Sequence, residues 1–342
     1  MGKIDLFKKL DEYYGITGNE NDIAFFVENK LKNYCNKVWL DKLGNVYGFI
    51  PSKCENAKKL MIETHLDCIG LMVKKIDENG FLQFEKLGPV DERILPASEV
   101  VVLGNENIFG VIGAKAAHIC LEDVQRPGIK NMLIDVGMKK DAAEQQIQIG
   151  DFVALKSDLT QLLNNKIAGV GVSSRACIVT VFDLLEKLEG ADLPYDLYVS
   201  FCVGRKSGSL GACTATFSVK PDVAIVIDAI SGKTGVDDHT KSSFKLGEGS
   251  VISRTPDTCY DGTLNLIKEA TKKGIPYNIN GSGRATWSDV TAIQNVAGAV
   301  HTFLLSVPVR YMNQTVETVC LDDISSCSEL AYLVASGGVC VA

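Results

Sequence analysis

Histidine and aspartate side chains lie at two places where a buried strand is expected to end. The segment KKLMIETHLDCIGLMV is apolar almost throughout and is interrupted by His65 and Asp67, while Asp228 closes the apolar run AIVID. Because they are two residues apart on an extended chain, His65 and Asp67 point to the same face. Such a pair can bind a metal ion through the imidazole, or it can form a hydrogen bond without metal. Asp228 can bind a metal or cap a following helix.

The remaining histidines and the cysteines give no comparable signal. His118 and His301 have no acid at a spacing typical of metal ligands, and Asp237, Asp238 and His239 are typical of a polar loop. The chain has 11 cysteines and no Cys-x-x-Cys pair. Scattered cysteines of this kind are typical of a reducing cytosol, so we expect them to be structural and the protein to be cytoplasmic.

Composition excludes several classes of protein. The chain has 342 residues, of which 46% are hydrophobic and 23% are charged, and these values are typical of a folded globular protein. The net charge of −7 argues against a nucleic-acid partner. The longest apolar runs are shorter than the roughly 20 residues of a membrane-spanning helix, and the N-terminus lacks the apolar region of a signal peptide. We therefore expect no membrane partner either.

The order of the expected elements predicts how these residues are positioned. Strand and helix patterns alternate in residues 1–70 and 163–342, which predicts an α/β domain with a mostly parallel sheet flanked by helices. Residues 71–162 contain short strand-like pieces separated by Gly, Pro and Asp, which predicts an inserted small all-β domain. Ligands of open α/β sheets bind at the carboxyl ends of the strands, so His65 and Asp228 should meet at one edge.

The order of the motifs resembles that of the tetrahedral aminopeptidases, also called glutamyl or deblocking aminopeptidases and sometimes labelled endoglucanases. The resemblance covers nearly the whole chain. The segments that carry it are, in order, GITGNE, DKLGNV, THLDCIGLMV, GVIGAK, LIDVGMKK, LGACTATF, AIVIDAISG, LGEGSVI, IPYNI, SDVTAIQ and VPVRYMNQTVE. This many motifs in one order are a specific indication of fold and ancestry, although fold alone does not establish activity.

The resemblance implies a dinuclear zinc or cobalt site, of which this chain retains only part. His65 and Asp228 match ligands of one metal, and Asp67 matches the acid behind the histidine. The other functional positions carry different residues. Ser173-Ser174-Arg175 replaces the Asp-Asp-Arg motif of the bridging aspartate, Arg205-Lys206 replaces the Glu-Glu pair of general base and ligand, Asn313 replaces the final histidine ligand, and Ser288-Asp289-Val290 partly keeps a Thr-Asp-Ala segment.

These substitutions argue against two-metal chemistry. Two divalent cations need several carboxylates to offset their charge, whereas Arg205 and Lys206 bring positive charge and Ser173 only a neutral hydroxyl. Arginine cannot act as a general base because it does not give up its proton at any useful pH. We therefore expect a catalytically inactive homologue with no cofactor, or at most one weakly held zinc, cobalt or manganese. The alternative is a hydrolase of altered or single-metal chemistry.

The retained and the new charges suggest what such a chain does instead. We expect Arg205 and Lys206 to occupy the metal positions as ion-pair partners of Asp67 and Asp228. A pocket formed by Arg175, Arg205, Lys206 and Asp289 is a candidate for binding a peptide carboxylate or another small anion. The family forms dodecameric shells through its inserted domain. The resemblance therefore implies self-association, or co-assembly with an active paralogue, and an assembly, regulatory or binding role.

Overall fold

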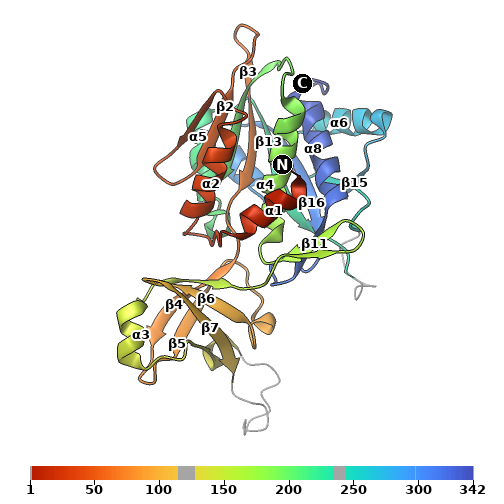
Figure 1. Ribbon diagram of the computed structural model, residues 1–342. Helices are drawn as coiled ribbons and strands as arrows, with labels where there is room; N and C mark the ends of the chain where they lie inside the picture. The colour runs from red at the N-terminus through yellow and green to blue at the C-terminus, as the bar shows by residue number, and fades with distance from the viewer. Residues whose placement is uncertain (1, 115–127, 235–243, 297, 342) are drawn as a thin grey trace.

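The computed structural model describes residues 2–114, 128–234, 244–296 and 298–341. Within these ranges the strands form an eight-stranded sheet, a three-stranded sheet and a closed barrel. Figure 1 shows the barrel at one end of the molecule and the large sheet with its helices at the other. His118 and the segment from Asp237 to His239 lie outside the described residues.

The large sheet is mixed. Four of its seven strand pairs are parallel, and three of these four are consecutive at its centre, from β12 through β3 and β13 to β16. The expectation of a mostly parallel sheet therefore describes the centre and the edge pair β14–β15, whereas β1–β2, β2–β12 and β16–β14 are antiparallel. Its strands, in spatial order, are β1 (Lys37–Leu40), β2 (Val46–Ile50), β12 (Tyr195–Cys202), β3 (Lys58–His65), β13 (Val223–Ser231), β16 (His301–Val309), β14 (Ser250–Arg254) and β15 (Tyr277–Gly281).

Helices cover both faces of the large sheet because its central strands are apolar on both sides. Along β13, Val223, Ile225 and Ile227 pack into one buried cluster, and Ala224 and Val226 pack into another. This alternation follows from the two-residue period of a strand. One face carries α1 (Lys3–Asp11), α2 (Asn21–Leu31), α4 (Val172–Leu188), α6 (Tyr260–Lys273) and α8 (Leu321–Ala335), and the other carries α5 (Leu210–Val219) and α7 (Val290–Val296).

Two local turns agree with the sequence patterns. Gly274 follows α6 with a φ of 68°, and its N–H donates to the last turn of the helix, as expected of a glycine C-cap. The turn between β1 and β2 contains Gly44 at a φ of 105°, and the Asp41 carboxylate accepts hydrogen bonds from the N–H groups of Leu43 and Gly44. A glycine is needed there because side chains disfavour that backbone conformation.

The barrel has its own apolar core and consists of antiparallel neighbours. Its strands are β4 (Gly70–Ile76), β5 (Leu82–Leu87), β8 (Met132–Asp135), β7 (Asn107–Ala114), β6 (Glu99–Leu103) and β9 (Phe152–Leu155), with α3 (Lys140–Gln146) beside them. The three-stranded sheet contains β10 (Thr160–Leu162), β11 (Lys166–Gly169) and β17 (Glu317–Cys320). The expected α/β fold with a small all-β part is thus present. The domain boundaries of 1–70 plus 163–342 and 71–162 stay a prediction.

The expectations about the cysteines and about membrane-spanning segments can be compared with the described part of the chain. All cysteines within it are free thiols. No described helix combines the length and the apolar character needed to cross a membrane.

Candidate functional site

The candidate site lies where neighbouring parallel strands of the large sheet end. His65 is the last residue of β3 and pairs in register with Cys202, the last residue of β12. Arg205 and Lys206 follow in η4 (Arg205–Ser207), a single turn of 3-10 helix. Asp228 lies on β13, which is the other neighbour of β3. The sheet therefore brings together residues that are far apart in the sequence, as expected for the carboxyl edge of parallel strands.

His65 is held between two carboxylates. Its Nε2 lies 3.5 Å from Asp228 Oδ1 and its Nδ1 lies 3.3 Å from Asp67 Oδ1 and 2.9 Å from the Asp67 carbonyl oxygen. All three residues are buried. Burial by itself lowers the pKa of His65, but the bonds to Asp228 and Asp67 outweigh it and raise the pKa to about 9. The imidazole is therefore a cation at neutral pH.

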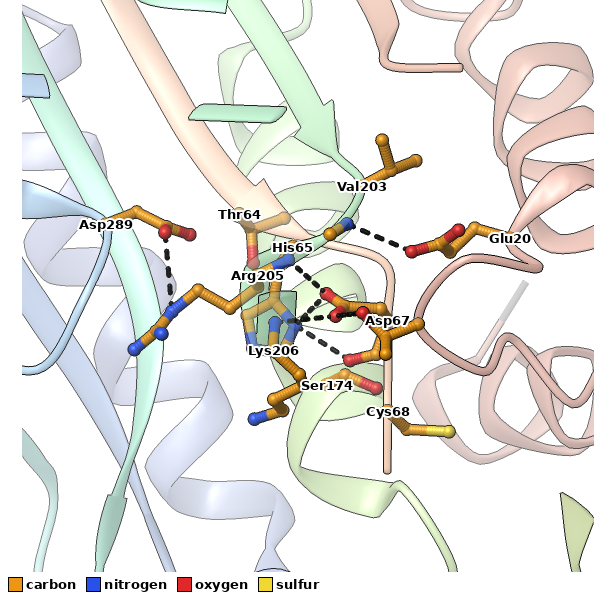
Figure 2. Close-up of polar contacts among 12 residues, drawn as sticks. Glu20, Thr64, His65, Asp67, Cys68, Ser174, Val203, Arg205, Lys206 and Asp289 are labelled. Atoms are coloured by element: carbon orange, nitrogen blue, oxygen red, sulfur yellow. Dashed lines mark hydrogen bonds and ion pairs between the residues drawn. The ribbon is translucent and has the colours of Figure 1, made fainter. Parts of the chain in front are cut away.

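Asp67 holds the backbone of the Arg205–Lys206 turn. Its Oδ1 accepts the Arg205 N–H at 3.1 Å, and its Oδ2 accepts the Lys206 N–H at 2.9 Å and the Thr17 hydroxyl at 2.6 Å. Figure 2 shows these bonds converging on the Asp67 carboxylate. Burial raises its pKa, but the contacts with His65 and these donors lower it to about 2. Asp67 thus contacts the main chain of this turn, whereas its ion pairing is with His65.

Arg205 pairs with Asp228, one of the two acids expected, and with Asp289 in place of Asp67. Its guanidinium lies 3.3 Å from Asp228 Oδ2 and 3.4 Å from Asp289 Oδ1, and it also donates to the Trp287 carbonyl. Asp289 immediately precedes α7 and is 2% exposed. Figure 2 shows the Arg205 side chain reaching toward Asp289 and away from Asp67. Arg205 therefore bridges one retained acid of the implied ligand set and the acid of the partly retained Ser-Asp-Val segment.

Glu63 is an unexpected member of the site. It lies on β3, is 0% exposed, and neither carboxyl oxygen has a hydrogen-bond partner among the described residues. Burial, followed by repulsion from Asp289 and Asp228, raises its pKa well above the ordinary range of a glutamate. Burial likewise raises the pKa of Asp289, against the attraction of Arg205. The physical cause is that a buried carboxyl without a hydrogen-bond partner is costly in its ionised form.

Ser173, Asn313 and Arg175 have hydrogen-bond partners other than Arg205 and its acids. The Ser173 N–H donates to Glu317 Oε2 at 2.9 Å, and the Asn313 N–H donates to Glu317 Oε1 at 2.6 Å. Arg175 donates to the carbonyl oxygens of Tyr13 and Tyr14, both at 2.7 Å, and lines a separate pocket. The structure thus does not bring Arg175 into the candidate anion pocket with Arg205 and Lys206.

A pocket opens beside Arg205, with a volume of about 440 Å³. Its ionisable lining residues are Arg205, Lys206, Asp228 and Arg284. Asp289 lies behind Arg205 and does not line the pocket. No described residue accepts a hydrogen bond from the Lys206 ammonium or forms an ion pair with it. The pocket is therefore richer in positive than in negative charge.

The donor set around this pocket does not fit the two metal ions that the resemblance implies. Within the described ranges, no group of three or more His, Cys, Asp and Glu side chains is placed to hold a metal ion. The two retained donors face each other, since His65 Nε2 points at Asp228, and the other Asp228 oxygen faces Arg205. A guanidinium 3.3 Å from that oxygen occupies space that a cation would need.

Several residues of the site gave only weak signals in the sequence. Glu63 is a charged residue inside an apolar run, and this feature of the sequence could have indicated a buried carboxyl. Thr17 lies in the GITGNE motif, and Glu317 in the QTVE segment, but neither spacing indicates a contact with Asp67 or Ser173. Arg284 and Trp287 lie in a polar segment without any pattern typical of a binding site.

Comparisons with known proteins agree with the fold and the motifs. The family model for M42 glutamyl aminopeptidases matches residues 44–330. The lysyl aminopeptidase of Pyrococcus furiosus is 29% identical over 334 residues, which cover 96% of this chain and 95% of that protein. An aminopeptidase structure from Desulfurococcus kamchatkensis has a TM-score of 0.90 at 29% identity, covering 98% of this chain and 95% of the other.

The similarity extends to a peptidase that forms large assemblies. The TET1 peptidase of Pyrococcus horikoshii, described as assembling into a tetrahedron or a large octahedral shell, has a TM-score of 0.84 at 26% identity. The match covers 98% of this chain and 99% of that one, so it includes the barrel as well as the large sheet. The resemblance found in the sequence motifs is therefore confirmed, and this chain belongs to the M42 glutamyl aminopeptidase family.

Proposed function

We propose that this chain is a member of the M42 family whose metal centre has been replaced by an ion-paired pocket, and that it does not hydrolyse peptides. The observation that carries the proposal is the position of Arg205, with its guanidinium 3.3 Å from Asp228 and 3.4 Å from Asp289. A buried acid without a partner is costly, and here a protein cation supplies the charge that a metal would otherwise supply.

Charge and proton chemistry both support inactivity. Two unit positive charges about 4 Å apart repel by about 4 kcal/mol at an effective dielectric constant of 20, and a divalent ion beside Arg205 would double this. Arg205 also stands at the position that the resemblance assigns to the general base. A guanidinium has no lone pair that can accept a proton from water at neutral pH. The family's role for this position is therefore lost together with its ligands.

The proposed biological role is assembly, regulation or ligand binding. The TET1 peptidase of Pyrococcus horikoshii is described as forming closed shells, and this chain matches it along almost its full length. We propose that residues 71–162 form a separate unit that mediates self-association, into a dodecamer or together with an active paralogue. Light scattering of the purified protein tests this, because a monomer at micromolar concentration would contradict it. The free thiols support the proposal of a cytoplasmic location.

Elemental analysis combined with an activity assay tests the central proposal. Protein purified without chelators should contain less than one equivalent of zinc, cobalt or manganese, and aminoacyl chromogenic substrates should show no turnover after these metals are added. A double variant, Arg205→Glu with Lys206→Glu, provides a comparison in which two donors are restored, and it should bind more metal than the natural chain. Two equivalents of metal in the natural chain, or metal-dependent turnover, would favour a hydrolase using His65 and Asp228.

A further inference from the structure

The pocket beside Arg205 is lined by two cations that form no ion pair with a described residue. The Arg205 guanidinium is already paired with Asp228 and Asp289. By contrast, Lys206 and Arg284 form no ion pair within the described part of the chain, although both line the pocket. Asp228 attracts Lys206 electrostatically but is itself engaged by Arg205 and His65, so the charges of Lys206 and Arg284 are only partly offset within the described residues.

The balance of charge in the pocket lining favours an anion. Three of the lining side chains are cations and one, Asp228, is an acid, and that acid is engaged by Arg205 and His65. The pocket therefore carries an excess of two positive charges, although the chain as a whole carries −7. Cations in a partly enclosed site attract anions more strongly than exposed cations do, because less water screens them.

The rest of the lining favours an organic anion over an inorganic one. Ile230, Leu304 and Met312 provide apolar surface, and the Trp287 side chain is 94% exposed at the same pocket. Hydroxyl and amide groups that can donate to carboxylate oxygens come from Ser253, Asn280 and Ser282, whereas the hydroxyls of Thr255 and Thr286 already donate to Asp257. The volume of about 440 Å³ lies within the range of small-molecule sites and exceeds what a phosphate ion fills.

We infer that this pocket binds a small dicarboxylate, with one carboxylate group at Lys206, the other at Arg284, and the carbon chain against the apolar lining. The inference rests on the proposed function, because the pocket is available to an organic anion only where Arg205, and not a metal ion, pairs with Asp228. Arginine suits such a site because its planar guanidinium can form two parallel bonds with one carboxylate. The binding reaction forms and breaks no covalent bond.

Isothermal titration calorimetry of the full chain at constant ionic strength tests the inference. The probes are glutarate and succinate, with acetate and inorganic phosphate for comparison. We expect both dicarboxylates to bind at least tenfold more tightly than acetate or phosphate. Lys206→Met and Arg284→Met should each weaken glutarate binding at least tenfold. Lys268→Met is the matched control, since Lys268 is exposed and forms no ion pair within the described residues, and it should bind glutarate as the natural chain does.

Three results would overturn the inference. The first is that the dicarboxylates bind no more tightly than acetate. The second is that phosphate binds as tightly as glutarate. The third is that Lys206→Met and Arg284→Met both bind glutarate like the natural chain while circular dichroism shows that they are folded. Chelator treatment separates this inference from the proposed function. Glutarate binding that persists after chelation supports both ideas. Metal-free protein that fails to bind glutarate refutes only the inference, whereas glutarate binding that requires two equivalents of metal refutes the proposed function as well.

Discussion

Replacing Arg205 by Met should destabilise the protein substantially. Methionine has a similar length and no charge, so the change removes the guanidinium and leaves Asp228 and Asp289 without their shared partner. The Arg205 side chain is 18% exposed, and those of Asp228 and Asp289 are 8% and 2% exposed, so water cannot fully replace the lost contact. Breaking a buried ion pair by removing one partner costs about 3–5 kcal/mol.

That free energy converts into a measurable change in melting temperature. The unfolding entropy of globular proteins is about 2.1 cal/mol/K per residue. For 342 residues this gives about 0.7 kcal/mol/K, so Arg205→Met should lower the Tm by about 4–7 °C at pH 7.5. Scanning calorimetry measures the Tm directly, and urea titration gives the free energy of unfolding where unfolding is reversible.

Lys206→Met is the matched control for this prediction. Lys206 is the next residue in the same turn and has the same charge, but it forms no ion pair with a described residue. Its replacement should therefore change the free energy of unfolding by less than about 1 kcal/mol. An Arg205→Met variant that melts within 1 °C of the natural chain, or a Lys206→Met variant that loses as much stability, would refute the argument that Arg205 neutralises buried acids.

Three further predictions concern other parts of the molecule. Glu317→Gln should cost about 1–3 kcal/mol in urea titrations, because an amide cannot accept both main-chain N–H groups that Glu317 now accepts; an unchanged midpoint would contradict this. Asp183→Asn should cost about 2 kcal/mol at pH 7, since Asp183 pairs with Lys3 and Lys187. Burial opposes ionisation of Asp183, but the two lysines outweigh it and lower the pKa of Asp183 below its ordinary value of 3.8. The loss of unfolding free energy in Asp183→Asn should therefore shrink as the pH falls below about 4, because the natural carboxylate then becomes protonated. A loss that stays constant with pH would exclude the ion pairs as its origin. Among the described cysteines, exposed Cys54 should react with maleimide before the buried ones, as mapped by mass spectrometry, and faster labelling of buried thiols in the folded protein would contradict the packing.

The general fold could be predicted from the sequence because its signals are local. The apolar run that ends at His65 became β3, and the helical spacing that ends at Gly274 became α6. The short strands separated by turn residues became the barrel. The three antiparallel strand pairs of the large sheet were not predicted, since strand direction depends on which strands become neighbours. That choice is made by tertiary packing and has no signature in a single strand.

The candidate site could be predicted only in part. Strand periodicity placed His65 and Asp67 together, and the end-of-strand rule placed Asp228 near them. Asp228 was among the expected ion-pair partners of Arg205 and Lys206, but Asp289 was not expected as a partner of Arg205, because a long side chain can reach several acids and its choice depends on the whole surrounding structure. The prediction that Arg175 lies near Arg205 took no account of the Tyr13 and Tyr14 carbonyl oxygens, which lie about 160 residues earlier in the sequence.

The retained residues of the implied metal site have contacts that do not require a metal. Asp67 holds two main-chain N–H groups of the Arg205–Lys206 turn and the Thr17 hydroxyl. Asp228 accepts the N–H of Ala229 and pairs with both His65 and Arg205. Removing either acid would leave buried donors or cations without an acceptor, which costs about 1–3 kcal/mol for each such group.

These contacts are sufficient to account for the presence of His65, Asp67 and Asp228, so the three residues by themselves do not establish catalysis. The imidazolium and the guanidinium offset the charges of the two acids, and burial raises the pKa of Glu63, which favours its neutral form. The same residues that would hold a metal in an active relative can thus hold the fold together here. We therefore propose that this sheet edge binds an organic anion at the place where an active relative would hold a metal, and the titration with glutarate tests this.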